Sequence, residues 1–206
     1  MYARSTTFHA DPARLDAGIE FCQDHVLPAL MHQSGCIGLS LLVDRQDGRC
    51  IATSAWQTRA TMRDSEAAVS GLRAEADTVL AAEHAIVEWE VTAVHRHHRS
   101  TDDSRARVTW AACDPEGLER ATDALRYGGV PQLDQVPDFG GTSLMVDRNA
   151  GRLCLTATYG TTRALRDSAE GEVQVRDLVL EEAGAEVLEI AEFELVLAHF
   201  HVPELV

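Results

Sequence analysis

Two stretches of this chain repeat one another. Residues 38–65 read GLSLLVDRQDGRCIATSAWQTRATMRDS, and residues 141–168 read GTSLMVDRNAGRLCLTATYGTTRALRDS. They align without a gap at a spacing of 103 residues, half the length of the 206-residue chain, and 13 of their 28 positions are identical. The match extends outward, to Asp11 and Pro12 with Asp114 and Pro115, and, after one inserted residue, to Glu88 and His95 with Glu192 and His199. The chain is therefore an internal duplication, and the repeated unit decides the fold.

The first copy predicts a simple order of elements. Tyr2–His9, rich in Thr and aromatic residues, predicts a strand. Asp11 followed by Pro12 predicts the start of a helix, and Pro28 predicts a kink or a second short helix. Two alternating strands at 37–44 and 49–56 enclose a hairpin turn, and a helix over 58–81 and a closing strand over 86–97 follow. This β-α-β-β-α-β order is ferredoxin-like.

The second copy repeats this order, at 107–112, 114–136, 141–147, 152–159, 161–180 and 187–202. We expect residues 1–98 and 106–206 to be the two repeats and the polar stretch 99–105 to be their linker. A four-stranded sheet with helices on one face leaves its other face bare, and a fused second copy would cover it, sheet against sheet. The sequence predicts an α+β protein whose tandem ferredoxin-like repeats form an intramolecular dimeric α+β barrel, either as a monomer or as a homodimer of the fused chain.

Composition narrows the range of partners. Apolar residues make up 45% of the chain and charged residues 25%, as in ordinary globular proteins. No segment approaches 18 uninterrupted apolar residues, and the N-terminal stretch MYARSTTFHADP has no apolar region of a secretory signal, so we expect no membrane partner and a cytoplasmic location. A net charge of -15 argues against nucleic acid and anionic lipid. Five cysteines without a C-x-x-C pair fit reduced thiols.

The hairpin and strand at 41–56, the helix carrying Met62 and Ser65, and the closing strand at 192–198 resemble the antibiotic-biosynthesis-monooxygenase type of dimeric α+β barrel. The resemblance covers essentially the whole chain, twice. Relatives of this type include oxygenases of aromatic polyketides, quinol oxygenases, haem-degrading enzymes, isomerases and proteins with no known reaction, so the fold does not fix the function. Most associate as homodimers with the ligand cavity between sheet and helices.

The resemblance leaves two functions open. One is a cofactor-independent monooxygenase, in which a base deprotonates a planar aromatic or quinol-like substrate and the resulting anion reacts with O₂. The alternative is a non-catalytic member that binds a small hydrophobic or aromatic molecule or mediates protein association. The haem-degrading relatives rely on an asparagine, a tryptophan and a histidine carried by a helix. The resemblance therefore implies no haem chemistry here, because the only asparagine is Asn149 in a hairpin turn and the second helices contain no histidine. We therefore expect no cofactor.

Trp56 and Tyr159 end the third strand of each copy at equivalent positions. The resemblance implies that an aromatic residue here lines the cavity and stacks on a planar substrate. The alternative is a core aromatic whose N–H or O–H finds a hydrogen-bond partner. Because the two residues differ while the motif around them is kept, the two copies are expected to have diverged.

Two H-x-H pairs end the closing strands, His95 with His97 and His199 with His201. Alternation places both rings of a pair on one strand face, where His95 or His199 could accept a proton from substrate. A metal would need a third ligand that the sequence does not place, so no metal is expected.

Carboxylates occupy the opposite face of the same strands, at Glu88, Glu90, Glu192 and Glu194. Carboxylates inside an apolar strand are costly without a partner. We expect ion pairs with Arg4 and Arg107 on the first strands in preference to an acid/base role.

Overall fold

The computed structural model describes residues 1–97 and 103–200. The first half contains β1 (Tyr2–His9), η1 (Pro12–Arg14), α1 (Leu15–Phe21), η2 (Cys22–Val26), α2 (Leu27–Met31), β2 (Cys36–Val43), β3 (Arg49–Trp56), α3 (Arg59–Asp64), α4 (Glu66–Leu80) and β4 (His84–Arg96). The second half repeats this order as β5 (Arg105–Ala112), α5 (Pro115–Asp123), η3 (Ala124–Gly129), α6 (Val130–Leu133), β6 (Phe139–Asp147), β7 (Arg152–Tyr159), α7 (Thr162–Asp167), α8 (Ala169–Ala183) and β8 (Glu186–Phe200). His201 and residues 99–102 of the predicted linker lie outside the described residues.

Hydrogen bonding between neighbouring strands follows the closed order β1-β3-β2-β8-β5-β7-β6-β4. The eight strands thus form one barrel, and the prediction of an α+β protein with tandem ferredoxin-like repeats is confirmed. None of the helices in 1–97 and 103–200 is long and apolar enough to cross a membrane.

The chain divides into two compact units that exchange the ends of their closing strands. Unit 1 contains Met1–Trp89 together with the end of β8, from Leu195 onward, and unit 2 contains Glu90–Glu194. The last residues of β4 accordingly pair with β6 in unit 2, from Glu90 opposite Val146 to Arg96 opposite Gly141. The compact units and the sequence repeats are therefore two different divisions of the chain, and the repeat boundaries stay a prediction.

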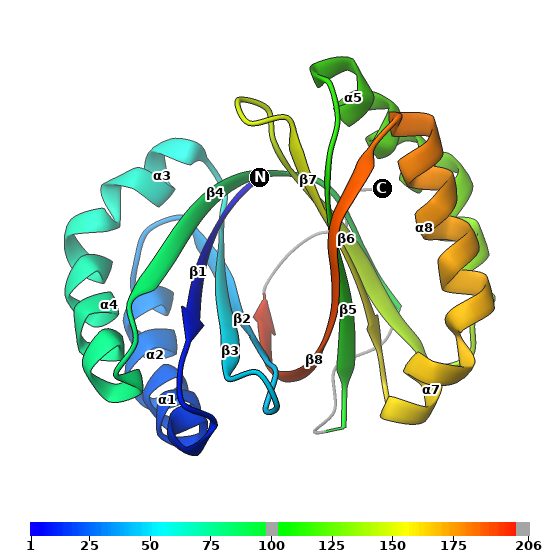
Figure 1. The fold of residues 1–206 in the computed structure, drawn as a ribbon. Helices are drawn as coiled ribbons and strands as arrows, with labels where there is room; N and C mark the ends of the chain where they lie inside the picture. The colour runs from blue at the N-terminus through cyan, green and yellow to red at the C-terminus, as the bar shows by residue number, and fades with distance from the viewer. Residues whose placement is uncertain (98–102, 201–206) are drawn as a thin grey trace. The chain divides into compact units, whose positions relative to one another are not determined.

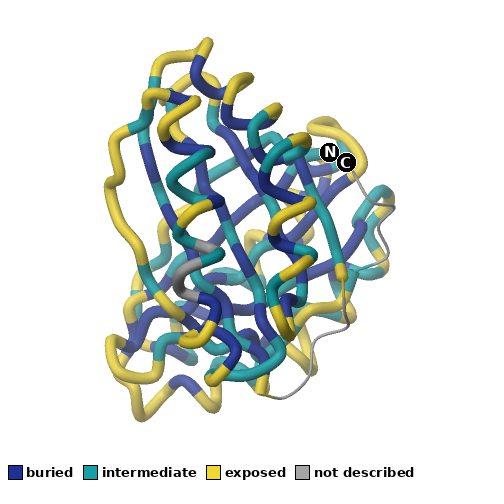
Figure 2. Tube along the Cα trace, turned by 90° about the vertical axis from the view of Figure 1, so that its right-hand side faces the viewer, coloured by how far each residue is buried: buried dark blue, intermediate teal, exposed yellow. Residues whose placement is uncertain are grey.

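Each unit packs its helices on one face of its strands (Figure 1). In unit 1, buried residues of α1, α2 and α4, among them Leu15, Leu30 and Leu80, join a core with residues of β1, β2 and β3. In unit 2, α5, α6 and α8 pack in the same way on β5, β6 and β7. Figure 2 shows the alternation of buried and exposed positions along the helices that this packing requires.

The helix starts follow the local sequence. The Asp11 carboxylate accepts a hydrogen bond from the backbone N–H of Ala13 at 2.9 Å, and Asp114 accepts one from Gly117 at 2.6 Å. Pro28 lies in the first turn of α2, after the wide π-type turn η2, which confirms the predicted second short helix.

The prediction of a single helix over 58–81 is wrong in one respect. The helix is interrupted at Ser65, which separates α3 from α4. The Ser65 hydroxyl donates to the carbonyl of Met62 at 2.8 Å, and Ser168 donates to Leu165 at 3.0 Å at the same place in the second copy. These side-chain hydrogen bonds compete with the helical ladder and end the first helix.

Candidate functional site

Unit 1 holds a cavity of about 80 Å³ between its strands and the helices α1, η2 and α4. Apolar side chains such as Phe8, Leu41 and Val69 form most of the lining. The polar lining residues include Arg4, Ser54 and Arg73. The cavity therefore offers an apolar volume with charged groups at its wall, the usual composition of a small-molecule site.

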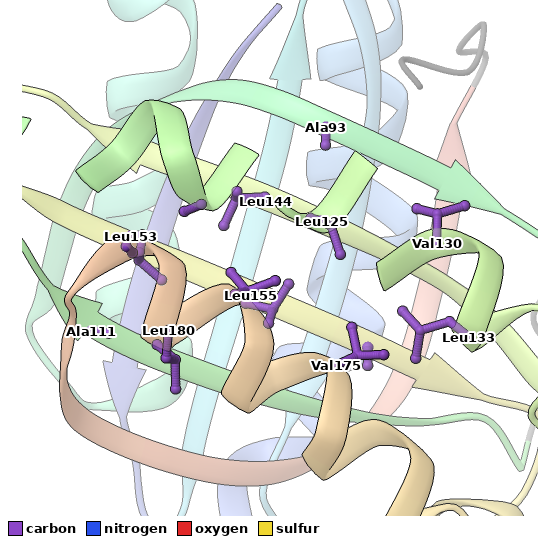
Figure 3. Close-up of a cluster of buried hydrophobic side chains, with 14 of the residues drawn as sticks. Ala93, Ala111, Leu125, Val130, Leu133, Leu144, Leu153, Leu155, Val175 and Leu180 are labelled. Carbon is purple, nitrogen blue, oxygen red and sulfur yellow. The ribbon is translucent and has the colours of Figure 1, made fainter. Parts of the chain in front are cut away.

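The cavity arises from small residues at positions where the second copy carries large ones. At a spacing of 103 residues, the lining residues Cys22, Cys50, Ala52 and Ala76 correspond to Leu125, Leu153, Leu155 and Val179. These four larger residues belong to the buried cluster of unit 2. Figure 3 shows strand leucines of this cluster beneath the helices, Leu153 and Leu155 among them. Since interiors are close-packed, each shortened side chain in unit 1 leaves space that its equivalent in unit 2 fills.

Two guanidinium groups lie at the cavity wall with their charges balanced. Arg4 is only 5% exposed; its Nη1 lies 2.9 Å from Glu66 Oε2 and its Nη2 donates to Glu88 Oε1 at 3.1 Å. Arg73 binds the other oxygen of Glu66. Burial lowers the pKa of Arg73 from its ordinary value; the charge of Glu66 opposes this shift, and that of Arg4 adds to it. The wall therefore presents fixed donors in a poorly solvated place.

The predicted pairing of strand carboxylates with Arg4 and Arg107 is confirmed for Glu88 and Glu192, whereas Glu90 pairs instead with an arginine outside the first strands. Glu88 binds Arg4 at 3.1 Å, and Glu192 binds Arg107 at 2.7 Å. Glu90 binds Arg148 at 2.7 Å.

Both cavity cysteines are neutral thiols at neutral pH. Burial raises the pKa of Cys22 to about 12 and that of Cys50 to about 11. The thiolate is the nucleophile, so these residues contribute shape to the cavity and not covalent chemistry. Burial likewise raises the pKa of Cys154 in unit 2 to about 12.

We expect the free energy of unfolding to fall as pH rises from about 9 towards 11. An unfolded thiol ionises near pH 8.5, whereas the buried thiols of Cys22, Cys50 and Cys154 stay protonated, so alkaline pH favours the unfolded state. All 18 basic residues are arginines, so no lysine titration overlaps. Urea unfolding at several pH values measures the slope. Replacing the three cysteines by alanine should flatten it, Cys113→Ala should change it less, and an unchanged slope in the triple variant would contradict the assignment.

A second polar cluster lies in unit 2, at the end of β4. His95 Nε2 lies 2.7 Å from Asp134 Oδ1, and the His95 ring stacks on Phe139 with centroids 6.4 Å apart and planes at 15°. Phe139 in turn meets the ring of Tyr159 edge-on at 6.1 Å. His97 Nδ1 lies 3.3 Å from the same Asp134 oxygen. The structure thus brings His95 and Tyr159 against one phenylalanine, on elements 64 residues apart in sequence.

Trp56 lies in the core of unit 1 and not among the cavity-lining residues. It is fully buried, and its Nε1 donates to Ser54 Oγ at 3.1 Å. Ser54 lines the cavity and donates to the backbone carbonyl of Arg4 at 3.4 Å. Trp56 is therefore linked to the cavity through Ser54. The other predicted histidine, His199, is an exposed residue of β8 in unit 1.

Sequence reasoning missed the cavity residues and Asp134. The self-alignment of the two copies does contain a signal for the cavity, because the first copy carries Cys22, Cys50 and Ala52 where the second copy carries leucines. Asp134 gives no comparable signal, because it stands at the end of a short helix, 39 residues from His95, where an acidic residue is ordinary.

A scan against protein-family models finds no match. Among solved structures, the chain is similar to an anthrone oxidase-like protein, with a TM-score of 0.68 and 14% identity over 95% of this chain and 91% of the other. A ferredoxin-fold protein related to antibiotic biosynthesis monooxygenases, from Listeria monocytogenes, gives a TM-score of 0.54 and 9% identity over 95% and 94%. These likenesses place the fold among the antibiotic-biosynthesis-monooxygenase-like barrels, as the sequence predicts.

Relatives in sequence extend over the whole chain. Mycobacterium tuberculosis protein Rv2558 is 42% identical over 207 residues, covering all of this chain and 88% of the relative. Rv2557 from the same organism is 41% identical over 206 residues, covering all of this chain and 92% of the relative. At this identity over the full length, the chain belongs to the family of Rv2557 and Rv2558.

Proposed function

We propose that the protein binds a small, largely apolar molecule in the unit 1 cavity and acts as a cofactor-independent monooxygenase on a planar aromatic or quinol-like compound. The observation that carries the proposal is an apolar cavity with the buried guanidinium of Arg4 at its wall. Similarity of fold to an anthrone oxidase-like protein supports the class of reaction.

The size of the cavity favours a single ring. Its volume of about 80 Å³ is below the 150 Å³ or so of an engineered cavity that binds benzene and well below the range of drug-sized pockets, about 300–1,000 Å³. A hydroquinone or simple phenol would need a small outward adjustment of the surrounding helices, and three fused rings would need a large one. We therefore propose a one-ring substrate.

The charges at the wall suit an anionic intermediate. Loss of a proton from a phenolic hydroxyl leaves an oxyanion, which Arg4 or Arg73 would stabilise by a charge-assisted hydrogen bond. The electron-rich anion then reduces O₂; one oxygen atom enters the ring and the other leaves as water, with the two hydrogens that the substrate loses. No resident redox group is required for this balance.

Glu66 is the proposed proton acceptor, beside the two arginines of the cavity wall. Its carboxylate contacts both Arg4 and Arg73, the groups that would hold the substrate oxygen. This replaces the roles predicted for His95 and His199, since His95 binds Asp134 in unit 2 and His199 is exposed. Trp56 is proposed to act on the cavity through Ser54, and Tyr159 has no proposed contact with substrate.

Filling the cavity tests the proposal. The double variant Cys50→Leu with Ala52→Leu gives unit 1 the residues found in unit 2, and it should abolish binding of phenols and hydroquinones measured by calorimetry. Cys113→Leu also replaces a cysteine by leucine, but in unit 2, and it should leave binding unchanged. Melting curves check that both variants are folded.

Oxygen consumption with the same phenols and hydroquinones tests the reaction. The wild type should consume O₂, Glu66→Gln should lower the rate about 10²–10⁴-fold, and the cavity-filled variant should consume none. Binding without consumption would favour the non-catalytic alternative. Absence of binding by the wild type would contradict the site itself.

A further inference from the structure

We propose that His95, His97 and Asp134 form a binding site for a divalent cation of the zinc class in unit 2. Their ligand atoms all lie within 4.8 Å of one another. Asp134 Oδ1 lies 2.7 Å from His95 Nε2 and 3.3 Å from His97 Nδ1. The site is separate from the unit 1 cavity and does not depend on the function proposed for it.

The spacing fits tetrahedral coordination after small movements. Zinc binds imidazole nitrogen at about 2.0–2.1 Å and carboxylate oxygen at about 2.0–2.2 Å, so neighbouring ligands lie roughly 3.4 Å apart. The His97–Asp134 distance of 3.3 Å already has this value, and the His95–Asp134 distance of 2.7 Å needs to open by less than about 1 Å. Rotation of the side chains provides movements of this size without a change in the backbone.

The backbone holds the three ligands close together. His95 is the next-to-last residue of β4 and His97 follows directly after the strand, so the two-residue spacing of an extended chain projects both side chains to one side. The N–H of His97 donates to the carbonyl of Gly140 at 3.0 Å. A Cβ on Gly141 would lie 2.6 Å from the backbone oxygen of His95, so this glycine lets β4 approach. Asp134 caps α6, and its N–H donates to Val130 at 3.1 Å.

The aspartate is a feature of one copy and not a requirement of the fold. Counting 103 residues back from Asp134, the spacing that also aligns Pro131 with Pro28, gives Met31. Both residues stand at the end of the short helix, α6 or α2, so either side chain is compatible with it. His95 has its own equivalent in His199, whereas the position of the third ligand carries Met31 in the first copy.

The donor set specifies the class of ion. Two imidazoles and one carboxylate suit Zn²⁺, Fe²⁺ or Co²⁺ better than Mg²⁺ or Ca²⁺, which prefer all-oxygen ligands. Three protein ligands leave a coordination position open to water or to an exchangeable ligand, as in metal sites that are not purely structural. The chain's net charge of -15 favours cation binding further.

Titration of the chelator-treated full-length protein tests the site. Calorimetry with Zn²⁺ should give one ion per chain, and Co²⁺ should give the visible absorption of a low-symmetry, nitrogen-and-oxygen-ligated ion. Asp134→Met, which copies the first repeat, and His95→Gln should each weaken Zn²⁺ binding at least about 100-fold, the upper end of the effect of losing a supporting residue around a metal. His199→Ala, the matched histidine change in the other unit, should leave binding unchanged.

A conservative variant keeps the test valid if Asp134→Met fails to fold. Asp134→Asn preserves a hydrogen-bond acceptor for the imidazoles but removes the negative charge, so it should remain folded and still lose most of the affinity. Absence of stoichiometric Zn²⁺ binding by the wild type, or binding that survives both Asp134→Asn and His95→Gln, overturns the proposal.

Discussion

A fragment of residues 104–206, which contains the second sequence repeat (106–206), will not fold as a monomer, whereas a fragment of residues 90–194 will retain far more native structure. The fragment that begins at residue 104 lacks residues 90–96, the end of β4 that pairs with β6 in unit 2. It also removes Thr92, whose hydroxyl accepts a hydrogen bond from Thr122 at 3.0 Å, and Ala93, a member of the buried cluster. Without this strand, β6 becomes an unpaired edge, which promotes association with other chains.

Far-UV circular dichroism and size-exclusion chromatography distinguish the two fragments. We expect 104–206 to aggregate or self-associate. In the 90–194 sample, a larger fraction of the protein should be monomeric and show a cooperative thermal transition. Both fragments contain the same helices and the strands β5, β6 and β7. They differ at their ends, because 90–194 adds residues 90–103 and lacks the end of β8 from Leu195 onward, which belongs to unit 1. A monomeric 104–206 with a cooperative melt equal to that of 90–194 would contradict the division into units.

The double variant Glu66→Gln with Glu88→Gln will lose about 3 kcal/mol of unfolding free energy, the lower end of the range for breaking a buried ion pair, because both carboxylates are partly exposed. Arg4 is 5% exposed, so removing both partners leaves a guanidinium charge buried next to Arg73 without compensation. Urea unfolding at neutral pH measures the loss.

Two further variants make this result specific. Adding Arg4→Met to the double variant removes the uncompensated charge and should recover most of the lost stability. Glu192→Gln removes the equivalent carboxylate in unit 2, which is 52% exposed, and should cost less than about 1 kcal/mol. A double variant as stable as wild type, or a triple variant no better than the double, would show that Arg4 does not depend on these carboxylates.

Much of the fold follows from the sequence because local patterns determine its elements. Asp11 and Asp114 mark helix starts by capping. The alternation of apolar residues in 38–56 marks two strands, and the matching residues 141–159 mark two strands in the second copy. The break at Ser65 is not predictable in this way, since a serine inside a helix is tolerated unless its hydroxyl finds a carbonyl. The exchange of strand ends is not predictable from local sequence either. Alternation indicates which face of β4 is apolar, but it does not indicate which strand β4 pairs with.

The candidate sites are predictable only in part, for a related reason. The ion pair of Arg4 with Glu88 follows from the cost of a lone carboxylate in an apolar strand. A cavity forms where the side chains are too small to fill the space between strands and helices. It can be recognised only by comparing the side-chain volume of Cys50 with that of Leu153, the equivalent residue in the packed core of unit 2. The meeting of His95 with Asp134 depends on which strand end reaches which helix, and this is a property of the assembled unit.

The exchange of strand ends also sets an order of events during synthesis. Unit 1 needs the end of β8, residues 195–200, so it cannot be completed when Trp89 leaves the ribosome. The missing strand is about 110 residues downstream, which at about 5–20 residues per second means a delay of roughly 6–20 s. Unit 2 is contiguous from Glu90 to Glu194 and can therefore be complete first. The N-terminal part of the nascent chain must therefore wait for residues 195–200, and a chain of which only residues 1–194 had left the ribosome would carry an incomplete first unit and a finished second one.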